Sequence, residues 1–395
     1  MASAKDRKGR FAVQDPVRYA MIGGGQGAFI GPVHRTAAAI AGNCRLVAGA
    51  LSSDPERARL SGMSIGLTPE RSYASWQEML EREAEVPEGE RAEFVAIVTP
   101  NHVHAPAAIA ALEAGFPVLS DKPLTDTLEA ALAIEEAAKR TGGLLGVTHT
   151  YTGYPMVKQA RELVSGGSFG AVRRVMVRYT QGWLAKAEDS VGKQAEWRVD
   201  PSRSGLAGAF GDIGTHAFNL VEFITGQRMT RLSAEIRAAV PGRQLDDDGM
   251  AMFHLAGGGR GTLVASQICT GDANGLQISV WCEEAGVHWR QEQPNSLRVA
   301  PRGKPEEIWS PGGDRGYLGD AAMAAVRLPS GHPEGYFEAF ANIYRDFADA
   351  VRGQVPTNPS YASLEDGLAG MRFIQAAYDS SAQGAAWLDL QGENA

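Results

Sequence analysis

The chain has 395 residues with a net charge of −8, a hydrophobic fraction of 44% and three widely separated cysteines. This length predicts two domains, and the composition is that of a globular protein. The acidic balance argues against nucleic acid, the cysteines against a disulfide framework or a zinc ribbon, and the absence of a run of about 18 apolar residues against a membrane span. Because the basic first ten residues also lack the apolar stretch of a secretory signal, we expect a soluble, cytoplasmic protein without a nucleic-acid or membrane partner.

Residues 1–15 are predicted to form a solvated tail, and residues 16–150 alternate between short apolar runs and Ala-rich helical stretches. The expected strands are 17–22, 46–51, 94–98, 116–120 and 144–147, and the expected helices are 33–41, 105–114 and 127–140. Strands that alternate with helices at this spacing predict βαβ units. We therefore expect an α/β fold whose first domain is a Rossmann-type, doubly wound parallel sheet with helices on both faces.

The pattern changes in residues 151–395, where strands follow one another directly. After a helix at 156–164, the expected elements are strands at 172–179, 249–255, 261–267, 276–281 and 286–291 and helices at 337–351 and 364–378. Consecutive strands predict an α+β domain with an open, mainly antiparallel sheet. The acidic run 246–248 before one of these strands is interpreted as a solvated turn and not as a cation-binding loop.

A glycine-rich segment joins the first predicted strand to the first helix. Gly23, Gly25 and Ala28 give a G-x-G-x-x-A pattern, with Gln26 inside the turn. Glycine at such a turn lets the backbone approach a pyrophosphate, and the helix N-terminus supplies free N–H groups. In this strand-to-helix context the pattern predicts a dinucleotide site. The alternative is an ordinary glycine-rich turn.

The end of the second predicted strand bears on the choice of dinucleotide. NAD-selective sites usually carry a carboxylate there, whereas this chain has Ser52 and Ser53. With Arg57 nearby, these hydroxyls can accept a 2′-phosphate. Asp54 can reach the ribose or simply open the next helix, so these residues leave NAD and NADP open.

Three further motifs follow in order. The segment from Thr99 to His104 follows the third strand of the first domain, Lys122 follows the next strand, and a D-x-G-x-H spacing links Asp212 to His216. Together these motifs resemble the glucose–fructose oxidoreductase/inositol dehydrogenase/MocA (Gfo/Idh/MocA) family of NAD(P)-dependent sugar and polyol oxidoreductases, from about residue 17 to the last helix. The family's E-K-P lysine corresponds to Lys122 and its D-x-x-x-H pair to Asp212 and His216. Its T-P-N-x-x-H segment supplies Asn101 and His104.

Two positions depart from the family pattern. Asp121 stands where most members have Glu, and Asn219 replaces the acid that ends the D-x-x-x-H-x-x-D motif. Segments 197–201 and 331–335 resemble a long-chain branch similar to inositol or pyranose dehydrogenases. The resemblance implies a slight preference for NAD over NADP and a second domain that binds substrate and forms a homodimer or homotetramer through its sheet. The cofactor site is then expected to include Thr99, Asn101, His104, Asp121 and Lys122.

The chemistry of these residues fits oxidation of a secondary alcohol. The reaction needs a hydride acceptor, a base for the hydroxyl proton and positive charge beside the developing alkoxide. His216 is the predicted base, Asp212 the orienting carboxylate and Lys122 the group that stabilises the oxygen. The Lys122–Pro123 bond is a candidate for the cis form. Taken singly, a surface lysine and a satisfied core histidine are the alternatives.

The remaining candidates are expected to line a substrate cleft. They are His149, Tyr151, Tyr154, Arg178, Gln181, Trp183, Trp197 and Arg198. His332 is a weaker candidate without an assigned role. No metal is expected, because a nicotinamide mechanism needs none.

The predicted reaction is the reversible oxidation of an inositol (myo- or scyllo-inositol) or of an aldopyranose. One alternative is an NAD-dependent glycosidase, eliminase or amino-sugar oxidoreductase that uses transient oxidation. The other is a non-catalytic sugar or dinucleotide sensor, for which the presence of Lys122, Asp212 and His216 is an argument against.

Overall fold

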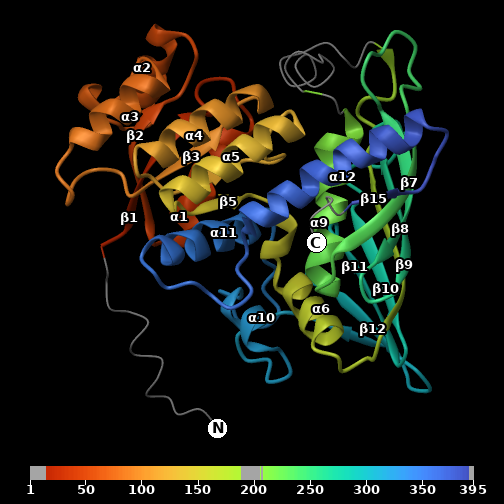
Figure 1. Ribbon diagram of the computed structural model, residues 1–395. Helices are drawn as coiled ribbons and strands as arrows, with labels where there is room; N and C mark the ends of the chain where they lie inside the picture. The colour runs from red at the N-terminus through yellow and green to blue at the C-terminus, as the bar shows by residue number, and fades with distance from the viewer. Residues whose placement is uncertain (1–14, 188–204, 206–207, 391–395) are drawn as a thin grey trace.

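The computed structural model describes residues 15–187, 205 and 208–390, which form two sheets with helices between and around them (Figure 1). The first sheet has the strand order β14-β5-β4-β3-β1-β2, in which β1 to β5 are parallel and β14 is antiparallel to β5. The predicted Rossmann-type sheet is therefore confirmed. Its strands are β1 (Val17–Gly23), β2 (Cys44–Ala50), β3 (Phe94–Val98), β4 (Val118–Ser120), β5 (Leu145–Val147) and β14 (Ala362–Ser363).

Helices cover both faces of this sheet. Tyr19 and Met21 of β1 face α1 and α11, whereas Ala20 and Ile22 face α3, α4 and α5. This alternation follows from the period of two along a strand. The helices of this domain are α1 (Ile30–Ala41), α2 (Pro55–Ser64), α3 (Trp76–Glu85), α4 (His104–Glu113), α5 (Leu128–Thr141) and the later α11 (Tyr336–Val351).

Local capping explains where several helices begin and end. Ser75 Oγ accepts the N–H of Glu78 at the start of α3, and Thr127 Oγ1 accepts the N–H of Ala130 at the start of α5. Gly142, with φ of 64°, ends α5 in the left-handed conformation. Within the described residues no helix is both long and apolar enough to cross a bilayer.

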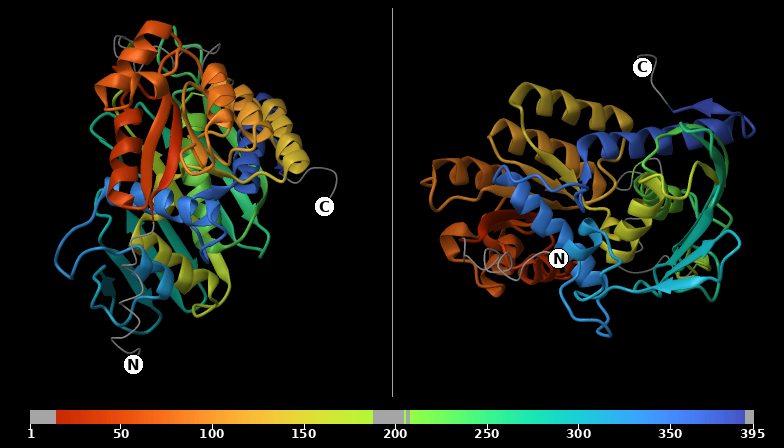
Figure 2. Two further views of the ribbon diagram at one scale, coloured as in Figure 1. Left: turned by 90° about the vertical axis from the view of Figure 1, so that its left-hand side faces the viewer. Right: turned by 90° about the horizontal axis from the view of Figure 1, so that it is seen from below.

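The second sheet has the strand order β13-β12-β11-β10-β6-β9-β8-β7-β15. It is antiparallel except for the pair β6 and β9, as the predicted mainly antiparallel sheet requires. Figure 2 shows it as a curved layer, with helices α6 and α9 between it and the first domain. The strands are β6 (Val172–Thr180), β7 (Met229–Arg237), β8 (Asp248–Leu255), β9 (Arg260–Ser266), β10 (Gln277–Cys282), β11 (Ala285–Arg290), β12 (Leu297–Pro301), β13 (Glu307–Trp309) and β15 (Leu388–Asp389).

The C-terminal part of the chain returns to the first domain. Helix α11 packs against α1, the hydroxyl of Tyr344 lies 2.8 Å from Nδ1 of His34, and β14 extends the parallel sheet. Residues beyond 151 therefore contribute to the core of the first domain. The helices of this part are α6 (Pro155–Ser165), α9 (Thr215–Thr225), α10 (Asp320–Ala324) and α12 (Leu364–Ala382).

Asp246 and Asp247 of the acidic run are buried and Asp248 begins β8, so the prediction of a solvated turn is wrong. Asp247 accepts the N–H groups of Ala239 (2.7 Å) and Val240 (3.0 Å) and lies 3.6 Å from the guanidinium of Arg243. Asp246 is also buried and accepts main-chain N–H groups just before residue 212. Backbone donors from distant segments converge here and need acceptors, which the local acidic pattern does not reveal.

Replacing Asp247 by Ala should lower the free energy of unfolding by about 3–5 kcal/mol, because the N–H groups of Ala239 and Val240 and the buried Arg243 lose their carboxylate. Urea titration measures this loss. The matched control is Asp248→Ala, whose partner Arg237 is exposed, and it should lose less than about 1 kcal/mol. Equal losses for the two variants would contradict the structural role of Asp247.

Candidate active site

The loop between β1 and α1 is a cradle that only glycine fits. Gly23 and Gly24 have positive φ values of 82° and 71°, which favour glycine. A Cβ on Gly23 would lie 2.4 Å from the carbonyl oxygen of Val98, and one on Gly25 would lie 2.4 Å from that of Leu51. The loop therefore has the close backbone packing that a pyrophosphate site requires.

A further glycine of the cradle, Gly31, was not predicted. A Cβ on Gly31 would lie 2.0 Å from the carbonyl oxygen of Gly24, so the first turn of α1 packs directly on the loop. Ala28, which was predicted for this position, lies in the loop and donates its N–H to the carbonyl of Gly25. The Gly31 contact is thus the close helix–strand packing expected of the third fingerprint glycine. Its one sequence signal is a glycine in the first turn of the helix.

The end of β2 supplies hydroxyls without a ribose-binding carboxylate. Asp54 caps α2, because its Oδ1 accepts the N–H of Arg57 at 2.7 Å. Ser52 Oγ accepts the N–H of Asp54 at 3.2 Å, while Ser53 and Arg57 are exposed. Of the two roles left open for Asp54, the structure shows helix capping.

The carboxyl end of β3 adds to this site. The hydroxyl of Thr99 is buried and has no hydrogen-bond partner among the described residues, and its methyl carbon would lie 2.7 Å from a Cβ on Gly23. Asn101 is also buried, and the N–H of Gln26 donates to Ser61 Oγ. The glycine cradle and this orphaned hydroxyl fit a dinucleotide that approaches the backbone closely.

His104 has a different role from the predicted cofactor contact. Its side chain is buried, and its two ring nitrogens lie 2.9 Å from the carbonyl oxygens of Thr99 and Pro123. A neutral ring has one N–H and donates to one of these two carbonyls, and both of its nitrogens face protein groups. His104 therefore links the end of β3 to the segment that carries Lys122.

Lys122 of the first domain meets Asp212 of the second. Its Nζ donates to Oδ1 and to the main-chain oxygen of Asp212, each at 2.6 Å, and the Lys122–Pro123 peptide bond is cis, as hypothesised. Gln267 Nε2 donates to the other carboxylate oxygen at 3.0 Å. Gln267 is a buried residue at the end of β9, and no motif in the sequence marks it. The structure thus brings together residues 122 and 212 and adds residue 267.

His216 lies in the first turn of α9, beside His149. The two Nδ1 atoms are 3.4 Å apart, and the Tyr151 ring packs edge-on against His216 with 4.8 Å between centroids. Burial lowers the pKa of His216 well below its ordinary value, and the charges of Lys122 and His149 act in the same direction. Burial and the charge of Lys122 also lower the pKa of His149, to about 3. Both imidazoles are therefore neutral near pH 7.

A chain of hydrogen-bonded polar side chains lies beside the imidazole rings of His149 and His216. The hydroxyls of Tyr151 and Tyr179 are in contact, the Tyr179 hydroxyl donates to Asn274 Oδ1 at 2.6 Å, and Gln181 Nε2 donates to the same oxygen at 2.8 Å. On the cofactor side, Asp121 Oδ1 accepts the hydroxyl of Thr148 at 2.8 Å. Asn274 and Thr148 had not been predicted.

Some predicted cleft residues lie elsewhere. Arg178 is exposed on the opposite face of β6 from the buried Tyr179, because neighbouring residues of a strand alternate, so its expected place in the cleft is corrected. His332 is exposed in a turn. Trp197 and Arg198 lie outside the described residues. In 15–187, 205 and 208–390, no group of three or more His, Cys, Asp or Glu side chains could hold a metal ion.

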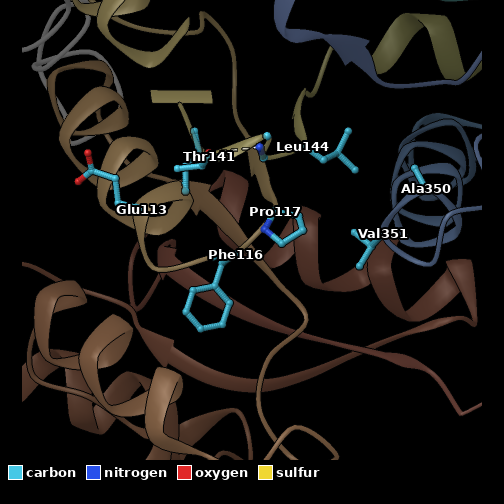
Figure 3. Close-up of a pocket in the computed structure, with 11 residues that line it drawn as sticks. Glu113, Phe116, Pro117, Thr141, Leu144, Ala350 and Val351 are labelled. Carbon is cyan, nitrogen blue, oxygen red and sulfur yellow. Dashed lines mark hydrogen bonds between the residues drawn. The ribbon is translucent and has the colours of Figure 1, made fainter. Parts of the chain in front are cut away.

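A surface pocket of about 530 Å³ lies at the other end of the parallel sheet (Figure 3). Phe116 and Pro117, just before β4, and Leu144, just before β5, are among its lining residues. Doubly wound sheets bind ligands beyond the carboxyl ends of their strands. This pocket is at the amino ends and contains none of the residues predicted for the site.

The stability of the protein should depend on the protonation of His149. Its pKa is about 3 when folded, against about 6.5 in an unfolded chain, so unfolding takes up a proton between these values. This group lowers the free energy of unfolding by about 1.4 kcal/mol for each pH unit as the pH falls below about 6.5. Urea titrations at pH 6 and pH 4 give the change in the free energy of unfolding with pH. In His149→Asn the contribution of this group to that change should vanish. His332→Asn, at an exposed position, is the control, and an unchanged slope in His149→Asn would contradict the prediction.

Two family models match the chain in sequence order. Residues 17–149 match the oxidoreductase family with the NAD-binding Rossmann fold, and residues 157–288 match the GFO/IDH/MocA C-terminal domain. The chain is 32% identical to the uncharacterized oxidoreductase YfiI of Bacillus subtilis (strain 168), over 97% of this chain and 99% of that protein. It is 27% identical to the levoglucosan dehydrogenase of Pseudarthrobacter phenanthrenivorans, over 71% of this chain and 75% of that enzyme.

A solved structure supports the same grouping. The inositol dehydrogenase homolog from Azotobacter vinelandii, complexed with NADH and myo-inositol, has a TM-score of 0.87 and 33% identity to this chain, covering 95% of this chain and 98% of that one. Both domain models and two nearly full-length relatives therefore agree. The chain belongs to the GFO/IDH/MocA family and is an oxidoreductase with an NAD-binding Rossmann domain.

Proposed function

We propose that the protein is a dehydrogenase that oxidises a secondary hydroxyl of a cyclic polyol or sugar, such as myo- or scyllo-inositol or an aldopyranose. The observation that carries this proposal is the contact of Lys122 with Asp212 beside the neutral His216. A cation and a base thus stand together at the carboxyl edge of a nucleotide-binding sheet, as alcohol oxidation requires. The substrates named for the relatives support the polyol and sugar class.

Lys122 can stabilise the reacting oxygen without leaving Asp212. An ammonium group has three N–H donors, and Oδ1 and the main-chain oxygen of Asp212 take two of them. The third donor is available for the oxygen of the substrate. Its charge lowers the energy of the alkoxide as the hydroxyl loses its proton.

His216 acts as the base through Nε2. Because its Nδ1 faces Nδ1 of His149, one of these two atoms must carry the proton that lies between them. A base needs its lone pair on Nε2, so Nδ1 of His216 carries the proton and His149 accepts the hydrogen bond. His149 thereby sets the tautomer of the base, and Asp212 favours the imidazolium that forms.

NAD(P), when bound, supplies the carbon that accepts the hydride. Gly23, Gly25 and Gly31 would admit its pyrophosphate, and Thr99 would meet it at the end of β3. We propose NAD as the preferred form, with NADP as the alternative. The NADH named in the Azotobacter complex favours NAD, whereas Ser52 in place of a carboxylate favours NADP.

We also propose that the protein forms a homodimer or homotetramer through the outer face of the second sheet. Met176 of β6 and Met250 and Met252 of β8 are 51%, 57% and 51% exposed on this face. Apolar side chains exposed together on an open sheet are typical of an interaction surface.

The purified protein should raise absorbance at 340 nm with at least one inositol isomer or aldose in the presence of NAD or NADP. His216→Ala should then lower kcat by about 10²–10⁴, because the hydroxyl loses its base. The affinity for NADH, measured by its fluorescence, should stay nearly unchanged.

The control for this comparison is His332→Ala at an exposed position. Full kcat in His216→Ala would remove His216 as the base. A protein that binds the cofactor and produces no NADH with any polyol or sugar would contradict the dehydrogenase and favour internal recycling of the hydride.

Replacing Ser52 by Asp should shift the cofactor preference toward NAD. The new carboxylate repels the 2′-phosphate of NADP and can hold the ribose hydroxyl of NAD. We expect the ratio of kcat/KM for NAD to that for NADP to rise by about 10-fold or more, which corresponds to about 1.4 kcal/mol. Ser64→Asp, at the far end of α2, adds the same charge away from the ribose. If both variants keep the original ratio, the ribose is recognised elsewhere.

A further inference from the structure

Asp121 joins two segments that carry residues of the site. Its Oδ1 accepts the main-chain N–H of Lys122 at 2.9 Å and the hydroxyl of Thr148 at 2.8 Å. Lys122 is therefore held at both ends, since its Nζ is bound by Asp212. Thr148 is the neighbour of His149 in the chain. The orientation of one carboxylate thus determines the position of the backbone from which the Lys122 side chain extends.

His34 of α1 faces the other oxygen of this carboxylate. Its Nε2 lies 3.8 Å from Oδ2 of Asp121, is buried, and has no hydrogen-bond partner in the part of the chain that the structure describes. The side chain of His34 is fully buried, and only 15% of the Asp121 side chain is exposed. A buried polar nitrogen without a partner is rare in folded proteins, and this one lies next to a carboxylate that binds the Lys122 segment.

The surroundings of His34 determine which ring nitrogen carries the proton. A neutral imidazole has one N–H. The Tyr344 hydroxyl lies 2.8 Å from Nδ1, whereas Nε2 faces the Asp121 carboxylate. A lone pair on Nε2 would be repelled by that negative charge, so the proton lies on Nε2 and the phenol donates to Nδ1. The Nε2–H dipole therefore attracts Oδ2 across a gap from which water is largely excluded.

Helix α1 gives His34 a fixed place beside the cofactor cradle. Gly31, one turn earlier in α1, packs directly on the backbone of Gly24. The imidazole of His34 packs edge-on against the ring of Phe340 in α11, with 4.6 Å between centroids. The imidazole is thus a rigid group, against which the more exposed carboxylate of Asp121 can be held.

We propose that His34 is a positioning residue for Lys122. Its Nε2–H holds Asp121 in the orientation in which Oδ1 binds the N–H of Lys122 and the hydroxyl of Thr148. His34 acts through Asp121 and touches neither the substrate nor the reacting atoms. This inference rests on the proposed function and deepens it, because it assigns a residue that places the cation beside the reacting oxygen.

His34→Phe keeps a ring in the core and removes Nε2. The kcat for the best substrate among the inositol isomers and aldoses should fall by about 10- to 100-fold, because a displacement of Lys122 by a fraction of an ångström weakens its contact with the alkoxide. The KM should stay within about 3-fold of wild type. His34→Gln, whose amide nitrogen can replace Nε2, should recover most of the kcat.

Tyr344→Phe is the matched control. Both this variant and His34→Phe lose the same buried hydrogen bond between the phenol and the imidazole, but only His34→Phe also loses the group that faces Asp121. Tyr344→Phe should therefore keep its kcat within about 3-fold of wild type. An equal fall of kcat in the two variants would show a packing defect and would overturn the assignment.

A double variant tests whether His34 acts through Lys122. Lys122→Met should lower kcat by about 10²–10³. In the Lys122→Met protein, His34→Phe should lower it by less than about 3-fold more, because residues that act as one unit are not additive. Multiplied effects in the double variant, or wild-type kcat in His34→Phe, would overturn the assignment.

Crystal structures of the two single variants give a readout that does not depend on activity. In His34→Phe the Asp121 carboxylate should turn away and lose its contact with Thr148, whereas in Tyr344→Phe it should keep its place. An unmoved carboxylate in His34→Phe would overturn the assignment. A wild-type protein that forms no NADH with any polyol or sugar would contradict the proposed function, and the place of Asp121 in these two structures would still decide whether His34 positions the Lys122 segment.

Discussion

The ion pair between Lys122 and Asp212 is the interaction on which the rest of the site depends. It joins the two domains, since Lys122 follows a strand of the parallel sheet and Asp212 precedes α9. After burial, the charge of Lys122 is the main cause of the low pKa values of His149 and His216. In the proposed mechanism, loss of this charge would make His216 less firmly neutral and would leave the reacting oxygen without a cation. Both side chains are largely buried, with 15% and 20% exposed, so breaking the pair costs free energy and the pair helps to hold the two halves together.

The second domain holds Asp212 in place through groups that are themselves buried. Asp246 accepts the N–H groups of Gly208 and Phe210, just before Asp212 in the chain. Gln267 holds the second carboxylate oxygen, and its own N–H donates to the carbonyl of Asp247. Residues 246 and 247 thus hold the backbone next to Asp212 and the side chain that binds its carboxylate. The buried Asp246 and Asp247 help to orient the carboxylate of Asp212, for which a role in the reaction is proposed.

Local pattern predicted the first domain well and the second domain in part. Strand β3 was predicted with its observed bounds, because five consecutive apolar residues from Phe94 to Val98 are typical of a buried parallel strand in a βαβ unit. Helix α3 was missed and α2 was expected only as a helix that Asp54 could open, since both sequences are mostly polar and their starts depend on the caps Asp54 and Ser75. Strands β7, β12, β13 and β15 were also missed. Strands β12, β13 and β15 are short, so their alternation is weak, whereas β7 has nine residues and its polar residues interrupt the apolar pattern.

The fold class, the glycine-rich turn and the motifs that carry Lys122, Asp212 and His216 could all be predicted from the amino-acid sequence. These features are local, because strand and helix periods and motif spacings are set by neighbouring residues. The packing of Gly31 on the turn, the outward direction of Arg178 and the burial of Asp247 depend on the tertiary structure. Each of these facts depends on which distant segments meet. Contacts between residues far apart in the chain leave no period or spacing in a single sequence, so only the folded chain shows them.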